Sequence, residues 1–218
     1  MKRNPFLGIM LLLLAATACT GGSRKEEAAK EPQRMEGEAE VNPVVEQLDN
    51  VSDSTIRVTL KEQHDDSLVF EVRKTNERLV LSTAKAQQTG QIKGSLTKGN
   101  DYALFPNTKE KSVETLINVS ELKGQWFYDM QQHRGMKFED RGGLSSINTE
   151  DISFREWKLL NGRLYIYYLT IDMLAPDRNE YLVEPAEIIS LSKEHMTLYF
   201  RNKAYECQRQ KKVIKMKF

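Results

Sequence analysis

The segment FREWKLLNGRLYIYYL, residues 154–169, constrains the fold more than any other part of the chain. Asn161-Gly162 joins two runs of aromatic and branched side chains, and Asn-Gly favours a two-residue hairpin turn with positive φ. Such a turn fixes which residues lie opposite each other on the two strands. The expected pairs are Trp157 with Ile166, Leu159 with Leu164, and Arg155 with Tyr168.

These six side chains share one face of the hairpin, because side chains alternate between the two faces along a strand. That face is mostly apolar, so we assign it to the protein interior, with Arg155 at its rim. The opposite face then carries Phe154, Glu156, Lys158, Tyr165 and Tyr167.

The same alternation recurs along much of the chain after residue 51. It is clearest in three stretches, with the apolar positions Ile56, Val58 and Leu60; Leu68, Phe70 and Val72; and Met196, Leu198 and Phe200. Further short strands are expected at 79–81, 91–96 and 102–105. No segment has a long helical pattern, so the chain is predicted to be all-β, as a barrel or a sandwich. We expect a small β module at residues 51–112, for which the oligonucleotide/oligosaccharide-binding (OB) type is one candidate, and a second β domain at 113–218.

The first 18 residues indicate export. Lys2 and Arg3 precede an apolar run from Phe6 to Ala18, whose 13 residues suit a signal peptide but fall short of the roughly 20 needed to span a membrane. Ala16-Thr17-Ala18 followed by Cys19 resembles the lipobox of bacterial lipoproteins. That resemblance implies cleavage before Cys19 and acyl chains, such as palmitate, that anchor the protein to a membrane. An ordinary signal peptide with an incidental cysteine is the alternative.

Residues 19–50 are predicted to form a flexible tether between the anchor and the folded part. They are rich in Glu, Lys and Ala and contain almost no large apolar residue before Val44, so they cannot bury enough surface to fold. Lys25-Glu26-Glu27 resembles the export signal of surface lipoproteins in Bacteroidetes, and a plain soluble linker is the alternative. The expected location is the bacterial cell envelope, at the outer membrane, facing either the periplasm or the surface.

A glycine and a tryptophan open a strand in the stretch ELKGQWFYD, at Gly124 and Trp126. This resembles the Gly-X-Trp entrance of lipocalins. Together with residues 142–169, it resembles the lipocalin-like domain of Bacteroidetes lipoproteins, whose two characteristic tryptophans match Trp126 and Trp157. The resemblance covers residues 113–207 and implies an eight-stranded up-and-down barrel with Trp126 at its narrow end. Alternatively, Trp126 simply fills the core.

The resemblance also implies a ligand site, with restrictions. The matching region is shorter than a full lipocalin, so the strands must be short and any cavity small. In lipocalins an arginine from the last strand often stacks on the entrance tryptophan, and Arg201 is placed for this role. The candidate ligand-binding residues are Trp126, Tyr128, Arg155, Trp157, Ile166 and Tyr168.

The leading hypothesis is a non-enzymatic, lipid-anchored envelope protein whose barrel binds a small apolar or aromatic ligand, or a partner, next to the membrane. The alternative is a filled barrel without cargo that acts as a scaffold for a protein or a glycan. An exposed group formed by Tyr165, Tyr167 and Tyr199 would favour the scaffold. An envelope hydrolase is a third hypothesis, and it requires two or more histidines and acids to meet in one cleft.

The composition offers little for catalysis or nucleic-acid binding. The net charge is +1, which gives no argument for nucleic acid. His64, His133 and His195 lack metal-ligand spacing, so no metal, cofactor or catalytic residue is predicted. Cys207 is expected to be a buried, inert thiol rather than one activated by its basic neighbours. The basic C-terminal end, residues 208–218, could be a last strand, a strip that binds anionic headgroups, or a frayed tail.

Overall fold

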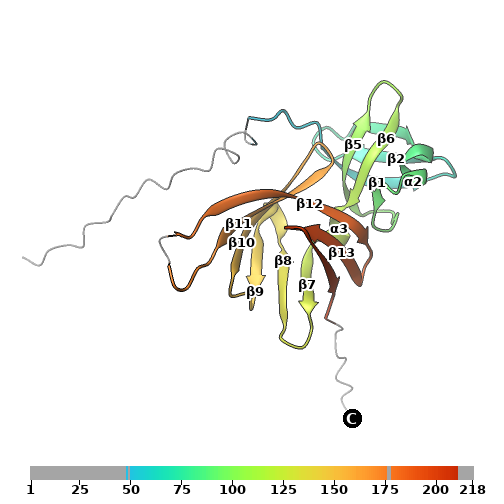
Figure 1. Ribbon diagram of the computed structural model, residues 1–218. Coiled ribbons are helices and arrows are strands. Elements are labelled where there is room, and N and C mark those ends of the chain that lie inside the picture. Colours follow the sequence, from blue (N-terminus) through green and yellow to red (C-terminus); the bar gives the residue numbers. More distant parts are fainter. Residues whose placement is uncertain (1–47, 49, 176–177, 211–218) are drawn as a thin grey trace, which may run out of the picture. The chain divides into compact units, whose positions relative to one another are not determined.

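The computed structural model describes residue 48, residues 50–175 and residues 178–210 (Figure 1). The predicted signal peptide, Cys19, the tether before residue 48 and the C-terminal residues 211–218 lie outside these described residues. Within the described part of the chain, no helix is long and apolar enough to cross a membrane. Strands dominate the described residues, so the all-β prediction is confirmed.

The first module is a small sheet that closes on itself. Its elements are β1 (Ile56–Gln63), β2 (Ser67–Val72), β3 (Arg78–Ser82), α2 (Ala84–Gln88), β4 (Ile92–Lys93), β5 (Asp101–Asn107) and β6 (Ser112–Asn118). The strand order is β3-β2-β1-β5-β6-β4, and β3 also pairs with β6 in parallel, which closes the ring. The five strands β1, β2, β3, β5 and β6 thus form a small closed barrel. The OB-like assignment of this module stays a prediction.

The predicted alternation builds the core of this module. Its buried side chains include Val58, Leu60, Leu68, Phe70, Tyr102, Leu104 and Leu116. The helix α2 was not expected, although its sequence AKAQQ consists of good helix formers. The strand expected at 91–96 is reduced to β4, because Gly94 follows it with a φ of 94° and turns the chain.

The second unit begins with a short helix and continues as a meander of strands. Its elements are α3 (Val119–Leu122), β7 (Gly124–Asp129), β8 (Arg134–Phe138), the 3-10 helix η1 (Asp140–Gly142), β9 (Leu144–Ile147), β10 (Ile152–Leu160), β11 (Arg163–Thr170), β12 (Tyr181–Leu191), β13 (His195–Phe200) and β14 (Lys203–Gln208). Each strand pairs with the next along the chain, except at β9 and β10, and β14 returns to pair with β7. A bridge between Gly143 and Glu156, and a hydrogen bond of 2.8 Å from Phe154 N to Ser146 Oγ, join the strands on either side of that gap. The result is an eight-stranded up-and-down barrel.

The predicted hairpin forms between β10 and β11. Trp157 pairs with Ile166 and Leu159 with Leu164, as expected. The third pair was wrong, because the register shifts between Phe154 and Glu156, and Phe154 takes the place opposite Tyr168. Such a bulge reverses the faces of the residues beyond it.

Arg155 is therefore exposed, whereas Phe154 is buried in the barrel core. The assignment of Arg155 to the interior rim and of Phe154 to the outer face is corrected accordingly.

The two modules are joined at the Asn161-Gly162 turn. Asn161 Oδ1 accepts a hydrogen bond of 2.9 Å from Ser54 N, and Asn161 Nδ2 donates one of 3.1 Å to Ser52 O. Gly162 N donates to Thr55 Oγ1 at 3.3 Å. The first sheet also extends to Asn118, past the division expected at residue 112, because β6 pairs with β5. The two modules are thus connected by specific hydrogen bonds at this junction rather than by a flexible linker.

Candidate functional site

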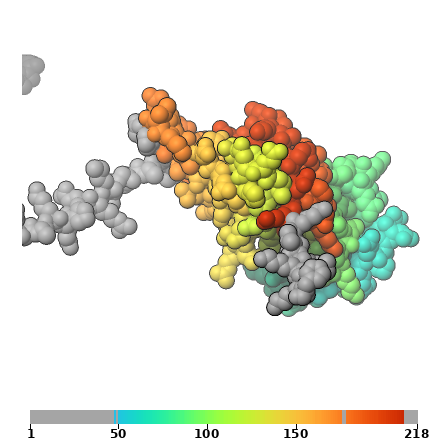
Figure 2. All heavy atoms as spheres, turned by 90° about the horizontal axis from the view of Figure 1, so that it is seen from below, coloured from blue at the N-terminus to red at the C-terminus, as the bar shows by residue number. Residues whose placement is uncertain are grey.

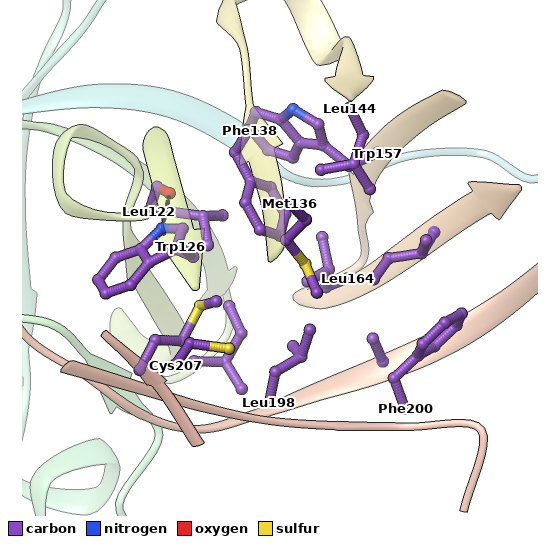
Figure 3. Packing of buried hydrophobic residues seen from close by; sticks show 14 of the residues in the cluster. Leu122, Trp126, Met136, Phe138, Leu144, Trp157, Leu164, Leu198, Phe200 and Cys207 are labelled. Atoms are coloured by element: carbon purple, nitrogen blue, oxygen red, sulfur yellow. Dashed lines mark hydrogen bonds between the residues drawn. The ribbon is translucent and has the colours of Figure 1, made fainter. Parts of the chain in front are cut away.

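The interior of the eight-stranded barrel is filled by side chains (Figure 3). Trp126, Ile166 and Tyr168 are 0% exposed, and Trp157 is 3% exposed. The ring of Phe138 meets that of Trp157 edge-on, with 5.8 Å between centroids. The aromatic side chains proposed to hold a ligand therefore contact protein atoms instead.

Trp126 is fixed at its end of the barrel by the backbone and by an arginine. Its Nε1 donates a hydrogen bond of 2.7 Å to Leu122 O (Figure 3). The guanidinium of Arg209 lies 4.2 Å from the centre of the ring and donates to the carbonyl oxygens of Glu121 and Lys123. Arg209 thus performs the stacking role predicted for Arg201.

The Gly-X-Trp motif has a steric explanation in this contact. Gly124 has a φ of 116°, which favours glycine, and a Cβ at this position would collide with the guanidinium of Arg209. Arg201 instead lies over the ring of Tyr168, 5.3 Å from its centroid. The prediction for Arg201 was wrong because it chose the arginine at the tip of the last hairpin rather than the one that follows β14.

Tyrosines and one carboxylate gather farther along the barrel. The hydroxyl of Tyr168 donates to the carboxylate of Glu184. Burial, together with this hydrogen bond, raises the pKa of Tyr168. Tyr128 packs against Tyr205 with ring centroids 5.1 Å apart, and burial raises the pKa of Tyr128 to about 12. Both tyrosines hold their protons at neutral pH, so they can donate hydrogen bonds but cannot act as bases.

The six predicted site residues are thus brought together only in part. Trp126, Trp157, Ile166 and Tyr168 belong to one buried cluster, and Tyr128 packs against it. Arg155 lies outside the cluster, on the solvent side of the bulge.

The three tyrosines expected to mark an exposed surface do not form one exposed group. Tyr167 is 2% exposed and packs with Val183, Leu48 and Tyr165, and Tyr199 is 41% exposed. Large exposed apolar side chains instead include Met173 and Leu174, in the loop between β11 and β12 that projects from the surface in orange in Figure 2.

A buried polar cluster at the junction was missed in the sequence. Asn118 and Glu121 are nearly inaccessible to solvent. Asn118 caps α3 by accepting from Glu121 N at 3.0 Å, and its Nδ2 donates to Ser95 O at 2.8 Å. Ser95 N in turn donates to Glu121 Oε2 at 2.8 Å. The signal was present, because Asn followed three residues later by Glu is typical of a helix start.

Two grooves flank the docked Asn161-Gly162 turn. The larger, which we call the Tyr199 groove, has a volume of about 570 Å³, in the usual range for ligand sites. It is lined by Gln91, Lys93, Thr115, Ile117, Gly162, Arg163, Leu164, Glu184, Pro185, Ala186, Glu187, Ile188, Tyr199, Phe200, Arg201 and Asn202. Lys93 Nζ donates to Ile189 O at 3.3 Å and ties its two sides together. Amide, hydroxyl and charged groups therefore converge beside one exposed aromatic ring.

The second, which we call the Arg57 groove, has a volume of about 460 Å³. It is lined by Asp53, Arg57, Arg73, Asp101, Val119, Lys123, Asp140, Arg141, Gly142, Trp157, Lys158, Leu159 and Leu160. The guanidinium of Arg57 lies 5.7 Å from the centre of the Trp157 ring. The indole of Trp157 therefore forms part of the junction as well as of the barrel core.

Groups suited to metal binding or nucleophilic catalysis do not converge within the described residues. These residues contain no cluster of three or more His, Cys, Asp or Glu side chains that could hold a metal ion. His64 contacts Glu62 at 3.6 Å, but both side chains are about half exposed. Cys207 is buried, as predicted, and burial raises the pKa of its thiol to about 12. A thiol with this pKa is a poor nucleophile at neutral pH.

A match to one protein family agrees with the barrel. The model of the lipocalin-like family matches residues 118–211. A crystal structure of a lipocalin-like protein from Bacteroides thetaiotaomicron VPI-5482 is 22% identical, covers 40% of this chain and 95% of that chain, and has a TM-score of 0.35. A comparison with curated proteins found no match. The family match coincides with α3 and the eight-stranded barrel, and a barrel of this kind supports a ligand-binding or scaffold role. The family match therefore supports a lipocalin-like domain in the second half of the chain.

Proposed function

We propose that this protein is a non-enzymatic, lipid-anchored protein of the bacterial cell envelope that binds a glycan in the Tyr199 groove. The filled barrel interior is the observation that carries this proposal. A ligand inside the barrel would have to displace side chains such as Trp126 and Ile166, which are fully buried. Binding outside the barrel needs no such displacement, so the scaffold hypothesis is favoured over carriage of a small apolar ligand.

The chemistry of the Tyr199 groove suits a short oligosaccharide. Gln91, Thr115 and Asn202 offer neutral donors and acceptors, and Arg163 and Glu187 offer charged ones. The groove volume of about 570 Å³ lies in the usual range for sites that bind compact ligands. Stable protein interfaces, by contrast, are extended surfaces of about 800 Å² on each partner. The aromatic ring of Tyr199, which lines the groove and is partly exposed, is a surface against which a sugar ring can pack.

The anchor and the location rest on the sequence. The short apolar run, the small residues and Cys19 support acylation at the outer membrane. Labelled palmitate should be incorporated into the wild-type protein and not into a Cys19→Ala variant. Equal labelling of both proteins, or none of either, would contradict the anchor.

Glycan binding can be measured by calorimetry with the full-length protein in detergent and a panel of envelope oligosaccharides. Tyr199→Ala should weaken binding by about tenfold or more, because one such contact is worth about 1.4 kcal/mol. Tyr181→Ala is the matched control, since Tyr181 is similarly exposed at 37% but lies outside the groove. No binding to any glycan, or equal losses in both variants, would refute the glycan assignment.

A further inference from the structure

The Arg57 groove carries more positive than negative side chains. Its five basic residues are Arg57, Arg73, Lys123, Arg141 and Lys158, and its three acidic residues are Asp53, Asp101 and Asp140. Two of the acids are engaged, because Asp101 pairs with Arg73 and Asp140 with Lys123, each at 2.8 Å. The third, Asp53, accepts hydrogen bonds from the backbone nitrogens of Thr55 and Asn161. The groove therefore has two more basic than acidic side chains. Its carboxylates also interact electrostatically with the remaining arginines, Asp53 and Asp101 with Arg57 and Asp140 with Arg141.

Two arginines supply much of this surplus. Neither Arg57 nor Arg141 forms an ion pair with another residue in the described part of the chain. Both border Trp157, since Arg57 stacks over its ring and Gly142, next to Arg141, would bring a Cβ within 3.0 Å of its carbonyl oxygen. The ring is itself held in place, because its Nε1 donates to Glu139 O at 3.2 Å. Arg57 and Arg141 thus both line the groove, and the guanidinium of Arg57 lies over the fixed ring of Trp157.

The backbone at Arg141 is unusual for an arginine. Its φ of 62° and ψ of 19° lie in the left-handed region, which Asn and Gly adopt more readily than residues with long side chains. Lys111, His133 and Arg201 also have a positive φ, so this conformation alone does not mark a functional position. It does show that asparagine suits position 141 at least as well as arginine.

We propose that the Arg57 groove binds an oxyanion of the phosphate type through the guanidinium groups of Arg57 and Arg141, which both line it. Planar guanidinium groups match the oxygens of phosphate with paired, charge-assisted hydrogen bonds. The site is separate from the Tyr199 groove, so it does not depend on the proposed glycan. The phosphate could be free or could belong to the headgroup of a phospholipid, since both present the same oxygens.

Calorimetric titration of the full-length protein with inorganic phosphate tests this site. Arg141→Asn removes the charge but suits the left-handed backbone, so the variant should fold at least as well as the wild type and bind phosphate about tenfold more weakly. Arg57→Lys keeps the charge but loses the planar fork, and it should also weaken binding. Arg155→Gln is the control and should leave phosphate binding unchanged, because Arg155 is exposed on β10 but does not line the groove.

Titration with glycerol 1-phosphate, the soluble headgroup of phosphatidic acid, distinguishes the two sources. Tighter binding of this ester than of inorganic phosphate identifies a lipid headgroup, and the reverse order identifies free phosphate. Equal phosphate affinities for the wild type, Arg141→Asn and Arg57→Lys would overturn the proposal. Affinities of the wild type weaker than about 10 mM for both probes, about 2.7 kcal/mol of binding, would overturn it as well.

Discussion

Replacing Arg209 by alanine should destabilise the lipocalin-like domain far more than its position at the end of the last strand would indicate. The substitution removes the stacking contact on Trp126, worth about 1 kcal/mol. It also removes the hydrogen bonds to the carbonyl oxygens of Glu121 and Lys123, each worth about 1 kcal/mol. The expected loss in the free energy of unfolding is about 3 kcal/mol, or about 6–12 °C in Tm for a chain of this size.

Arg201→Ala is the matched control for this measurement. Arg201 also stacks on a ring, that of Tyr168, but it is exposed at the tip of a hairpin, where such a contact is worth about 0.5 kcal/mol. Urea unfolding of the full-length protein, followed by tryptophan fluorescence, gives both values. The free energy of unfolding of Arg209→Lys should lie between those of the wild type and Arg209→Ala, because lysine keeps the positive charge but lacks the planar guanidinium group. Losses for Arg209→Ala and Arg201→Ala that agree within about 0.5 kcal/mol would refute the reasoning.

Two further predictions concern the junction and the titration of the barrel. Gly162→Ala should lower the free energy of unfolding by about 1–3 kcal/mol, because its Cβ would lie 2.9 Å from Thr115 Oγ1 and 3.2 Å from Phe105 Cβ. Gly90→Ala is the control, since Gly90 has a φ of 65° but lies in open space. This variant should lower the free energy of unfolding by about 1 kcal/mol, from backbone conformation alone. Because burial raises the pKa of Tyr128 from 10.0 to about 12, its contribution to stability is complete below pH 10 and is lost as the pH rises to about 12. Urea unfolding between pH 9 and 12 should show a shallower decline for Tyr128→Phe than for wild type, and identical slopes would contradict this assignment.

The strands and their inward faces could be predicted from the sequence because they depend on local alternation. Met196, Leu198 and Phe200 are buried in the barrel, and Trp157 and Ile166 are paired, as expected. The bulge beside Arg155 could not be predicted, because an extra residue in one strand leaves the alternation of each half intact. Its position is set by how β10 meets its neighbours rather than by its own residues.

The candidate site was less predictable, because it depends on contacts between distant parts of the chain. Arg209 reaches Trp126 only because β14 returns to β7, where Gln208 pairs with Phe127. The grooves form only because the hairpin turn at Asn161 binds residues that precede β1. Neither contact leaves a periodic pattern in the sequence. The cap formed by Asn118 and Glu121, in contrast, leaves a short local motif.

The occupied interior explains why recognition is expected outside this barrel. The strands β7, β8, β9, β13 and β14 have four to six residues each, whereas β10, β11 and β12 have eight to eleven. Trp126, Trp157 and Tyr168 all project into that small interior, and a small barrel of eight strands has just enough room for side chains. We therefore expect any ligand to bind where a second set of side chains meets the barrel wall. The junction with the first module offers such a place, since both grooves take residues from each of two sheets.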